Sequence, residues 1–333
     1  MTRAVVFGTG SWGTTFAMML ADAGAEVTLC GRRAALAEQI TRLHVNADYL
    51  PGVRLPDAVR ATTDPAAAVA GADLVVLAVP SQTLRANLAQ WRDLLPAGAP
   101  VVSLMKGVEL GTSRRMSEVV IEAGGVPPER VVVVSGPNLA REIAQHQPAA
   151  GVVACIDHDT ADVVAHACAT TYFRPYTATD VVGTELGGAV KNVIALAVGM
   201  AQGLGLGDNS KASLITRGLA ETTRLGEALG ADPLTFAGLA GVGDLIATCM
   251  SPLSRNRTFG EQLGGGRSVE QVVADTRQTA EGVTSCLSIL GLAEANGVDM
   301  PIVASVVAVV HHGLDPREMG RRLLSRARRP EQD

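Results

Sequence analysis

One lysine lies inside an apolar stretch whose spacing is typical of a helix. The stretch is ELGGAVKNVIALAVG, residues 185–199. Lys191 shares a helical face with Gly187 before it and Ile194 after it, because residues three, four and seven positions apart line up. A buried ammonium group is costly unless a partner offsets it. Two interpretations follow: the side chain extends along a packed surface with its charge in water, or the helix lines a cleft where the amine takes part in chemistry.

A glycine motif with phosphate-binding character follows the first expected strand. In GTGSWG, Gly8, Gly10 and Gly13 fit G-x-G-x-x-G, and the helical segment TTFAMMLADAG follows directly. Such glycines allow a tight turn, close approach of a pyrophosphate and close packing of helix on strand, while free N–H groups at the helix start bind the anion. The position of the motif in the first strand-helix unit predicts a dinucleotide site. A glycine turn without a ligand is the alternative.

The end of the second expected strand bears on which dinucleotide binds. A site for NAD usually has Asp or Glu there, about twenty residues after the glycines, whereas arginine accommodates a 2′-phosphate. The chain reads TLCGRR, with Gly31 at the acidic position followed by Arg32 and Arg33. We therefore expect NADPH as the preferred cofactor and NADH as the alternative. An exposed basic loop would also explain either arginine.

Two more candidate residues follow expected strands. Lys106 ends the apolar strand VVSLM, and ligands of open α/β sheets bind outside the carboxyl ends of strands. In SGPNLAREIA, Gly136 follows another such strand, and Asn138 is expected to cap the helix that comes next. Ordinary strand-to-helix turns are the alternative for both.

A later segment, GVGDLIATCMSPLSRNRTFG, collects polar residues between glycines. It contains Asp244, Ser254, Arg255, Asn256 and Arg257. Arginine offers a planar fork that suits phosphate oxygens, and neighbouring Ser and Asn donate hydrogen bonds to the same anion. The segment therefore predicts a phosphate site, with a solvated loop as the alternative.

The elements that must position these residues begin with an alternation of strands and helices. Short β-branched runs alternate with alanine-rich helical stretches up to about residue 178. The runs are AVVFG (4–8), EVTLC (26–30), DLVVLAVP (73–80), VVSLMK (101–106), VVVVS (131–135) and GVVACI (151–156). Continuous apolar strands are expected when helices cover both faces of a parallel sheet. Residues 1–179 are therefore predicted to form a doubly wound, Rossmann-type α/β domain that binds the dinucleotide.

Segments with helical spacing replace the strands beyond Thr179. Examples are residues 210–230 and 285–297, and the glycine clusters at 203–208 and 264–266 are expected to be loops. Residues 180–333 are therefore predicted to form an all-α domain.

Composition restricts the class of protein. A chain of 333 residues, 47% hydrophobic, is long enough for two domains. A net charge of −5 and 3% aromatic residues argue against nucleic-acid binding.

Five cysteines without a C-x-x-C pair indicate reduced thiols. The amino terminus resembles no signal peptide, and the apolar run after Asn192 is shorter than a bilayer span. We expect a cytoplasmic protein without stable membrane insertion.

The segments above resemble, in the same order, the signature segments of the bacterial NAD(P)-dependent glycerol-3-phosphate dehydrogenases. The resemblance covers roughly residues 4–310 and includes E-x-x-G-x-x-K-N and S-R-N. It implies reversible hydride transfer that reduces dihydroxyacetone phosphate to sn-glycerol 3-phosphate, which supplies glycerophospholipid synthesis. The chain departs from many members at Asn138 and Leu139, where those have a small hydroxyl residue and phenylalanine, and its double arginine is one of several family variants.

The resemblance also implies roles for single residues in the two predicted domains. It implies that Lys191 is the proton donor and acceptor. Implied substrate contacts are Lys106, Gly136, Lys191, Asp244, Ser254, Arg255 and Asn256. The implied dinucleotide contacts include the three motif glycines and are Gly8, Gly10, Ser11, Trp12, Gly13, Arg32, Arg33, Lys106, Gly136, Ala140, Arg255 and Glu281. The helical half would thus hold the catalytic lysine and most of the substrate contacts.

Ketone reduction would give the lysine a function. Hydride transfer develops negative charge on the carbonyl oxygen, so an acid must protonate it, and the reverse reaction needs a base at the same place. The six histidines lie outside the candidate segments, which leaves Lys191. Burial would lower its pKa from about 10.4, while a carboxylate such as Asp244 would raise it.

Other functions and partners remain open at this point. A related two-domain dehydrogenase of 3-hydroxyacids would share the α/β half and a helical lysine, and a non-catalytic dinucleotide sensor would bind cofactor without turnover.

Metal catalysis has little support, since His311 and His312 have no other ligand at a suitable spacing. The arginine-rich segment 317–329 is expected to be solvated rather than docked on anionic lipid. Long apolar helix faces permit a homodimer without requiring one.

Overall fold

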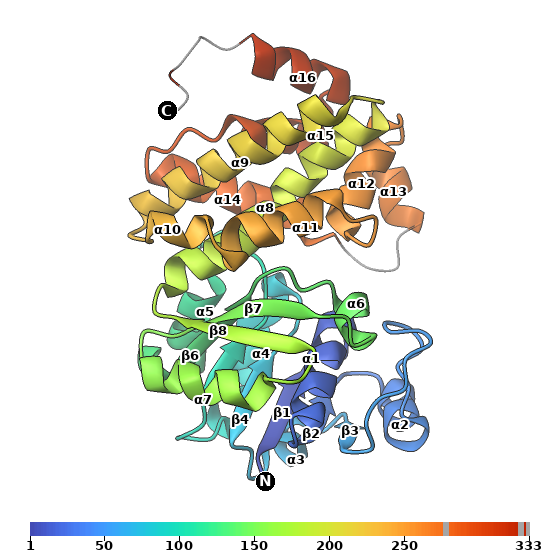
Figure 1. The fold of residues 1–333 in the computed structure, drawn as a ribbon, viewed down its shortest axis with the longest axis vertical. Coiled ribbons are helices and arrows are strands. Elements are labelled where there is room, and N and C mark those ends of the chain that lie inside the picture. The colour runs from blue at the N-terminus through green and yellow to red at the C-terminus, as the bar shows by residue number, and fades with distance from the viewer. Residues whose placement is uncertain (276–279, 326–329, 331–333) are drawn as a thin grey trace. The chain divides into compact units, whose positions relative to one another are not determined.

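The chain forms two compact units in this computed structural model, which describes residues 1–275, 280–325 and 330 (Figure 1). The sheet unit comprises Met1–Met105 and Arg115–Thr184, and the helical unit comprises Lys106–Arg114 and Glu185–Asp333. The segment Lys106–Arg114 thus packs with the helices, although the division predicted after residue 179 places it in the dinucleotide-binding half.

The described part of the sheet unit has eight strands in the order β3-β2-β1-β4-β5-β6-β7-β8. Their bounds are β1 Arg3–Phe7, β2 Glu26–Cys30, β3 Val59–Thr62, β4 Leu74–Leu77, β5 Val101–Ser103, β6 Val131–Ser135, β7 Ala149–Ala154 and β8 Phe173–Ala178. The six predicted runs correspond to β1, β2, β4, β5, β6 and β7. The sequence did not predict β3 and β8, because these edge strands are only partly buried and carry polar residues or proline instead of a continuous apolar run.

The strand pairs identify a doubly wound fold. All neighbouring strands of this sheet are parallel except β6 and β7, which are antiparallel. The order of connection reverses between β1 and β4, and ligands of such sheets bind outside the carboxyl ends of the strands at this point. Gly8, which follows β1, and Ala78, which follows β4, lie there. The predicted Rossmann-type class is confirmed.

Helices cover both faces of the sheet. They are α1 Ser11–Asp22, α2 Ala34–Leu43, α3 Pro65–Val69, α4 Leu84–Trp91, α5 Met116–Gly124, α6 Ala140–Ala144 and α7 His158–Cys168. Strand β1 shows why its sequence is continuously apolar. Val6 packs in one hydrophobic cluster with Phe16 of α1, while its neighbour Val5 packs in the other with Leu88 of α4. Successive side chains therefore enter opposite layers of the core, and both layers are apolar.

The helical unit contains no strand among its described residues. Its helices are α8 Val181–Gly203, α9 Asp208–Ala228, α10 Pro233–Phe236, α11 Asp244–Met250, α12 Arg255–Gly264, α13 Val269–Asp275, α14 Glu281–Ala295, α15 Pro301–His312 and α16 Pro316–Leu324; the first residues of α8 belong to the sheet unit. The predicted helices at 210–230 and 285–297 correspond to α9 and α14. Both predicted glycine loops follow helix ends, and the all-α prediction for this half is confirmed.

Helices α8 and α12 approach each other at the level of the backbone. Four glycines make this possible: a Cβ atom added at Gly199, Gly203, Gly260 or Gly264 would overlap a backbone oxygen of the opposite helix. The contact fixes the part of α8 that carries Lys191 close to the start of α12. The helix pair therefore positions the polar residues at the start of α12 relative to Lys191.

Helix α8 is also apolar enough, by length and composition, to cross a bilayer, and so is the segment Pro233–Met250. In α8, 89% of the most apolar window is buried inside the protein, as expected of a core helix. At the arginine-rich end, Arg321 and Arg322 are exposed and pair with Glu318, as predicted for a solvated helix. Residues 326–329, which complete that segment, lie outside the described residues.

A buried carboxylate joins two helices of this unit. Glu221 of α9 is 2% exposed, and its carboxylate accepts hydrogen bonds from the backbone N–H groups of Ile302 (2.8 Å) and Val303 (3.3 Å) in the first turn of α15. These donors are otherwise unsatisfied at a helix start. Burial raises the pKa of Glu221 from 4.5 to about 7.

Glu221 should make stability depend on pH. Its pKa is higher in the folded state, so between the two pKa values the folded protein holds a proton that the unfolded chain releases. The contribution of this proton to the free energy of unfolding is complete below about pH 4.5 and is lost as the pH rises to about 7. We expect the wild type to lose about 3 kcal/mol relative to Glu221→Gln over this window. Urea unfolding at a series of pH values measures the difference.

The matched control is Glu227→Gln, which changes an exposed glutamate on the same helix. Its unfolding free energy should follow that of the wild type across the window. A constant difference between wild type and Glu221→Gln at all pH values would contradict the assignment.

Candidate functional site

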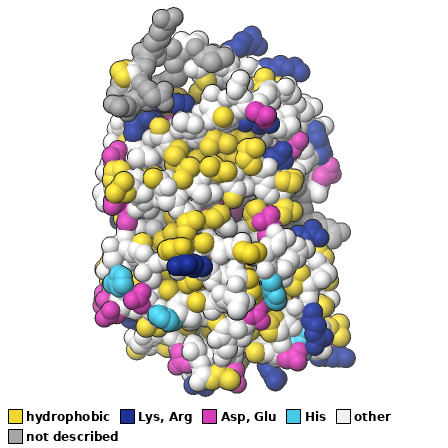
Figure 2. All heavy atoms as spheres, in the orientation of Figure 1, with side chains coloured by type: hydrophobic (Ala, Val, Ile, Leu, Met, Phe, Trp, Pro, Cys, Tyr) yellow, Lys and Arg dark blue, Asp and Glu magenta, His cyan; other side chains and the backbone are white. Residues whose placement is uncertain are grey.

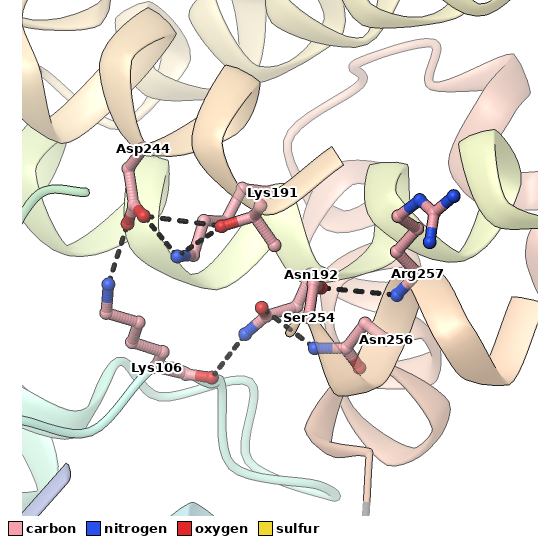
Figure 3. Close-up of polar contacts among 8 residues, drawn as sticks. Lys106, Lys191, Asn192, Asp244, Ser254, Asn256 and Arg257 are labelled. Atoms are coloured by element: carbon pink, nitrogen blue, oxygen red, sulfur yellow. Dashed lines mark hydrogen bonds and ion pairs between the residues drawn. The ribbon is translucent and has the colours of Figure 1, made fainter. Parts of the chain in front are cut away.

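Lys191 is buried in the middle of α8, and its ammonium group is paired. Its side chain is 8% exposed. The Nζ atom donates hydrogen bonds to Asp244 Oδ1 and to Thr248 Oγ1, the latter over 2.8 Å (Figure 3). The interpretation in which the lysine extends its charge into water is therefore wrong. The amine belongs to a buried polar centre.

One carboxylate holds two lysines in this centre. Asp244, the first residue of α11, is 1% exposed, and its second oxygen accepts a hydrogen bond from Lys106 Nζ over 2.7 Å (Figure 3). Thr248 lies one helical turn after Asp244, so its hydroxyl reaches the same amine. Lys106, Lys191 and Asp244 were all predicted as site residues, and the structure brings them together.

The electrostatics of the centre act mainly on Lys191. Removal from water disfavours the charged amine and, together with the positive charge of Lys106, outweighs the opposing effect of Asp244, so the pKa of Lys191 falls from 10.5 to about 7. A lysine with a pKa lowered toward neutrality can both give and take a proton. Burial and the second lysine thus give Lys191 the properties of an acid-base group.

A chain of amides connects this centre to two further helices. Asn192 Nδ2 donates to the backbone oxygen of Lys106 (3.5 Å), and Asn192 Oδ1 accepts from Asn256 Nδ2 (2.9 Å). Asn256 Oδ1 in turn accepts from the backbone N–H of Gly282 (2.9 Å), next to Glu281 at the start of α14. Both ends of the Asn256 side chain are therefore engaged by the protein.

The other predicted residues of the phosphate segment lie at the start of α12. Ser254 caps this helix, since its Oγ accepts the backbone N–H of Arg257 over 3.3 Å. Arg255 is the first residue of the helix and is exposed. The sequence therefore places two residues of S-R-N-R where N–H groups and a guanidinium can meet an anion.

Sequence reasoning missed Asn192 and Thr248. Asn192 was part of the quoted E-x-x-G-x-x-K-N segment, but nothing in that spacing shows that its amide meets Asn256. Thr248 is four residues after Asp244, so helical spacing could have placed both on one face. Both residues lie directly beside Lys191 or Asp244.

The glycine motif in the sheet unit has the form that a dinucleotide requires. Gly8 has a φ of +117°, and a Cβ atom there would overlap the backbone oxygen of Ala78. At Gly10, by contrast, no heavy atom of the described residues other than the glycine itself and its two chain neighbours lies within 4 Å of such a Cβ position. The backbone at the start of α1 is therefore open to a pyrophosphate.

Buried polar atoms of the sheet unit are consistent with a bound cofactor. The Nε1 atom of Trp12 is buried without a hydrogen-bond partner among the described residues. The same holds for both amide atoms of Asn138, which follows Gly136 at the end of β6. Donors and acceptors of this kind are rarely left without a partner, and a cofactor rich in polar groups can supply them.

The prediction that Asn138 caps a helix is wrong. Helix α6 begins at Ala140, its cap residue is Leu139, and Leu139 makes no side-chain hydrogen bond to the helix. Gly136 has a φ of +123°, and Pro137 follows it, so the chain turns before it can become helical. The helix start is thereby delayed beyond the reach of Asn138.

Arg32 and Arg33 follow β2, as predicted from the sequence. Arg32 is exposed. Arg33 pairs with Asp48 over 2.6 Å and lies over the ring of Tyr49, 5.2 Å from its centre. The contacts of Arg32, Arg33 and the other candidate residues with a substrate or cofactor stay predictions.

Comparison with known proteins identifies relatives over the whole chain. Family models described as NAD-dependent glycerol-3-phosphate dehydrogenase N-terminus and C-terminus match residues 3–161 and 180–321. The glycerol-3-phosphate dehydrogenases (NAD(P)+) of Streptomyces griseus and Streptomyces coelicolor are 64% and 65% identical over 329 residues, which cover 99% of this chain and 98% of each relative.

Solved structures agree with these relatives. The glycerol-3-phosphate dehydrogenase of Coxiella burnetii is 35% identical, with a TM-score of 0.93 over 98% of this chain and 99% of its own. A D-mandelate dehydrogenase is 16% identical, with a TM-score of 0.61 over 96% and 99% of the two chains, and shares the fold alone.

The amide chain predicts an effect on stability. An aspartate at position 256 keeps the acceptor for Gly282 but loses the donor to Asn192, so we expect Asn256→Asp to lower the free energy of unfolding by about 1–3 kcal/mol. Urea unfolding followed by circular dichroism measures this loss. Asn209→Asp, at an exposed position in α9, is the control and should change stability little. Equal stability of both variants would argue against the amide chain.

Proposed function

The chain belongs to the NAD-dependent glycerol-3-phosphate dehydrogenase family, and from this premise we propose that it reduces dihydroxyacetone phosphate reversibly to sn-glycerol 3-phosphate. The observation that carries the proposal is the buried amine of Lys191, hydrogen-bonded to Asp244 and Thr248. A hydroxyacid dehydrogenase could also use such a lysine, but the S-R-N-R segment at the start of α12 suits a substrate with a phosphate group.

When bound, a reduced nicotinamide would supply hydride to the carbonyl carbon. The ammonium group of Lys191 protonates the carbonyl oxygen as negative charge develops there, and in the reverse direction the neutral amine removes the hydroxyl proton. Asp244 and Thr248 hold the amine in one orientation, because each accepts one of its hydrogen bonds. Its lowered pKa brings the two protonation states close in free energy near neutral pH.

The substrate would be held by residues of the same polar centre and by α12. Lys106 and the exposed Arg255 offer positive charge, and the first N–H groups of α12 offer donors to phosphate oxygens. Ser254 and Asp244 are proposed as further contacts. The side chain of Asn256 is engaged by Asn192 and Gly282, so we assign it a positioning role and leave its backbone as the part that meets substrate.

A nicotinamide dinucleotide is the proposed cofactor, held by the sheet unit through the glycine motif. Gly8, Gly10 and Gly13 would receive the pyrophosphate, with Ser11 and Trp12 beside it. Further proposed contacts are Arg32, Arg33, Lys106, Gly136, Ala140, Arg255 and Glu281. The exposed Arg32 supports NADPH as the preferred form, with NADH also accepted.

The setting of the enzyme is part of the proposal. We infer a cytoplasmic enzyme whose product supplies glycerophospholipid synthesis. Hydrophobic side chains gather on the surface of the helical unit (Figure 2), and exposed ones include Leu234 of α10 and Met250 of α11. Such a surface supports a homodimer.

The reaction itself is the first test. Purified protein with dihydroxyacetone phosphate should oxidise NADPH, and NADH more slowly, as measured by loss of absorbance of the reduced nicotinamide. A panel of 3-hydroxyacids with the oxidised cofactors should give no turnover. Binding of either cofactor without oxidation in the presence of dihydroxyacetone phosphate would instead indicate a dinucleotide sensor, and turnover of a hydroxyacid would indicate the related dehydrogenase.

Replacing the proposed acid-base group should abolish most of the turnover. We expect Lys191→Met to lower kcat by about 10²–10⁴-fold and to leave dinucleotide binding unchanged, as measured by fluorescence titration. In the wild type, kcat for reduction should fall as the pH rises through the lowered pKa of about 7, because the acid is lost, while kcat for oxidation should rise. Residual activity of the variant should lack this dependence.

Lys211→Met is the matched control, since Lys211 pairs with Asp208 on α9 and is no part of the polar centre. It should keep the kcat and the pH profile of the wild type. Normal turnover by Lys191→Met would refute the acid-base role and leave the family assignment intact.

A further inference from the structure

The segment after α2 is bound directly to the glycine motif. Asn46 is fully buried, and its Nδ2 donates to the backbone oxygen of Thr9 (2.9 Å) and to Thr14 Oγ1 (2.8 Å). In return, Ser11 Oγ donates to the backbone oxygen of Tyr49 over 2.7 Å. These hydrogen bonds join positions more than thirty residues apart in the chain. They fix residues 46–49 beside the turn that is proposed to hold the pyrophosphate.

The usual place for a ribose-binding acid is closed in this chain. In NAD sites, Asp or Glu at the end of the second strand holds the ribose hydroxyls. Here that position is Gly31, and a Cβ atom built on it would lie 2.6 Å from Cγ2 and 3.0 Å from Oγ1 of Thr9. Any side chain at position 31 would require the side chain of Thr9 to move. A carboxylate at the ribose would therefore have to come from another segment.

Asp48 is such a carboxylate. It belongs to the segment 46–49, its side chain is 52% exposed, and it accepts a hydrogen bond from Arg33 Nη1 over 2.6 Å. Arg33 follows β2 by three residues and lies over the ring of Tyr49, from the same segment. One acid and one arginine thus lie beside the end of β2, where the adenosine ribose of a dinucleotide would bind.

We propose that Asp48 is the residue that sets the preference between NADH and NADPH. With NADH, its carboxylate accepts a hydrogen bond from the 2′-hydroxyl of the adenosine ribose while Arg33 stays paired with it. With NADPH, Arg33 transfers to the 2′-phosphate, for which its planar fork is suited, and Asp48 opposes binding by like charge. Exchange of partners costs little, because an exposed ion pair contributes little to stability. The inference rests on the dinucleotide binding proposed above.

Direct binding of the two cofactors tests the role of Asp48. In Asp48→Asn, the like-charge repulsion is removed and the acceptor for the ribose hydroxyl is weakened. We expect the Kd for NADPH to fall and the Kd for NADH to rise, so that the ratio of Kd(NADH) to Kd(NADPH) increases about tenfold. Titration of nicotinamide fluorescence without substrate gives both constants. The fragments 2′,5′-ADP and ADP, titrated by calorimetry, should show the same change of ratio.

Arg33→Met should move the ratio in the opposite direction, because it removes the group that meets the 2′-phosphate. Asp57→Asn is the matched control: this exposed aspartate pairs with Arg54 over 3.0 Å in the same unit, and its loss should leave both constants unchanged. All three positions are exposed, so the melting temperatures should stay near that of the wild type.

Two results separate the failure of this inference from failure of the proposed function. If the wild type binds both dinucleotides and Asp48→Asn changes the two constants by the same factor, or changes neither, Asp48 does not set the preference. If the wild type binds neither dinucleotide, the proposed function and this inference both fail.

Discussion

Asp244 is the group on which the polar centre of the helical unit depends. Its single carboxylate lies between the amines of Lys106 and Lys191, and all three groups are removed from most of the solvent. Without it, two ammonium groups would face each other in a medium that screens charge poorly. With it, the protonated centre still has one positive charge in excess. A phosphate-bearing ketone is the kind of partner that would neutralise this excess, so the charge balance agrees with the substrate class proposed.

The position of that centre is set by residues that carry no charge. Glycines let α8 and α12 meet at their backbones, and the amides of Asn192 and Asn256 connect the two helices beside Lys191. Small residues thus bring the helices together, and the amides fix which residues face each other. A larger side chain at Gly260, for example, would separate α12 from α8, and with it Ser254 and Asn256 from Lys191. Chemistry at one amine therefore depends on packing several turns away.

Much of this arrangement could be predicted from single segments. The interior strands could be predicted because both of their faces are apolar. Lys191 could be identified as a candidate because its helical stripe offers no polar neighbours. Edge strands β3 and β8 could not be predicted, since half-exposed strands lack a continuous apolar run. Helical spacing relates Thr248 to Asp244, but no local spacing encodes the contacts of Asn192 with Asn256 and of Thr248 with Lys191, which join residues 64 and 57 positions apart. The pair formed by Arg33 and Asp48 likewise exists only because the chain after α2 folds back onto the glycine motif.

The path of the chain between the units limits how this enzyme can evolve. Lys106 belongs to the helical unit, yet it is encoded within the half of the chain that the N-terminal family model covers. An exchange of halves between distant relatives would therefore bring together a lysine from one parent and its aspartate from the other. The loop that carries this lysine must also present its backbone oxygen to Asn192. The two halves are thus expected to be inherited together, and recombination is constrained more tightly than the two-part architecture suggests.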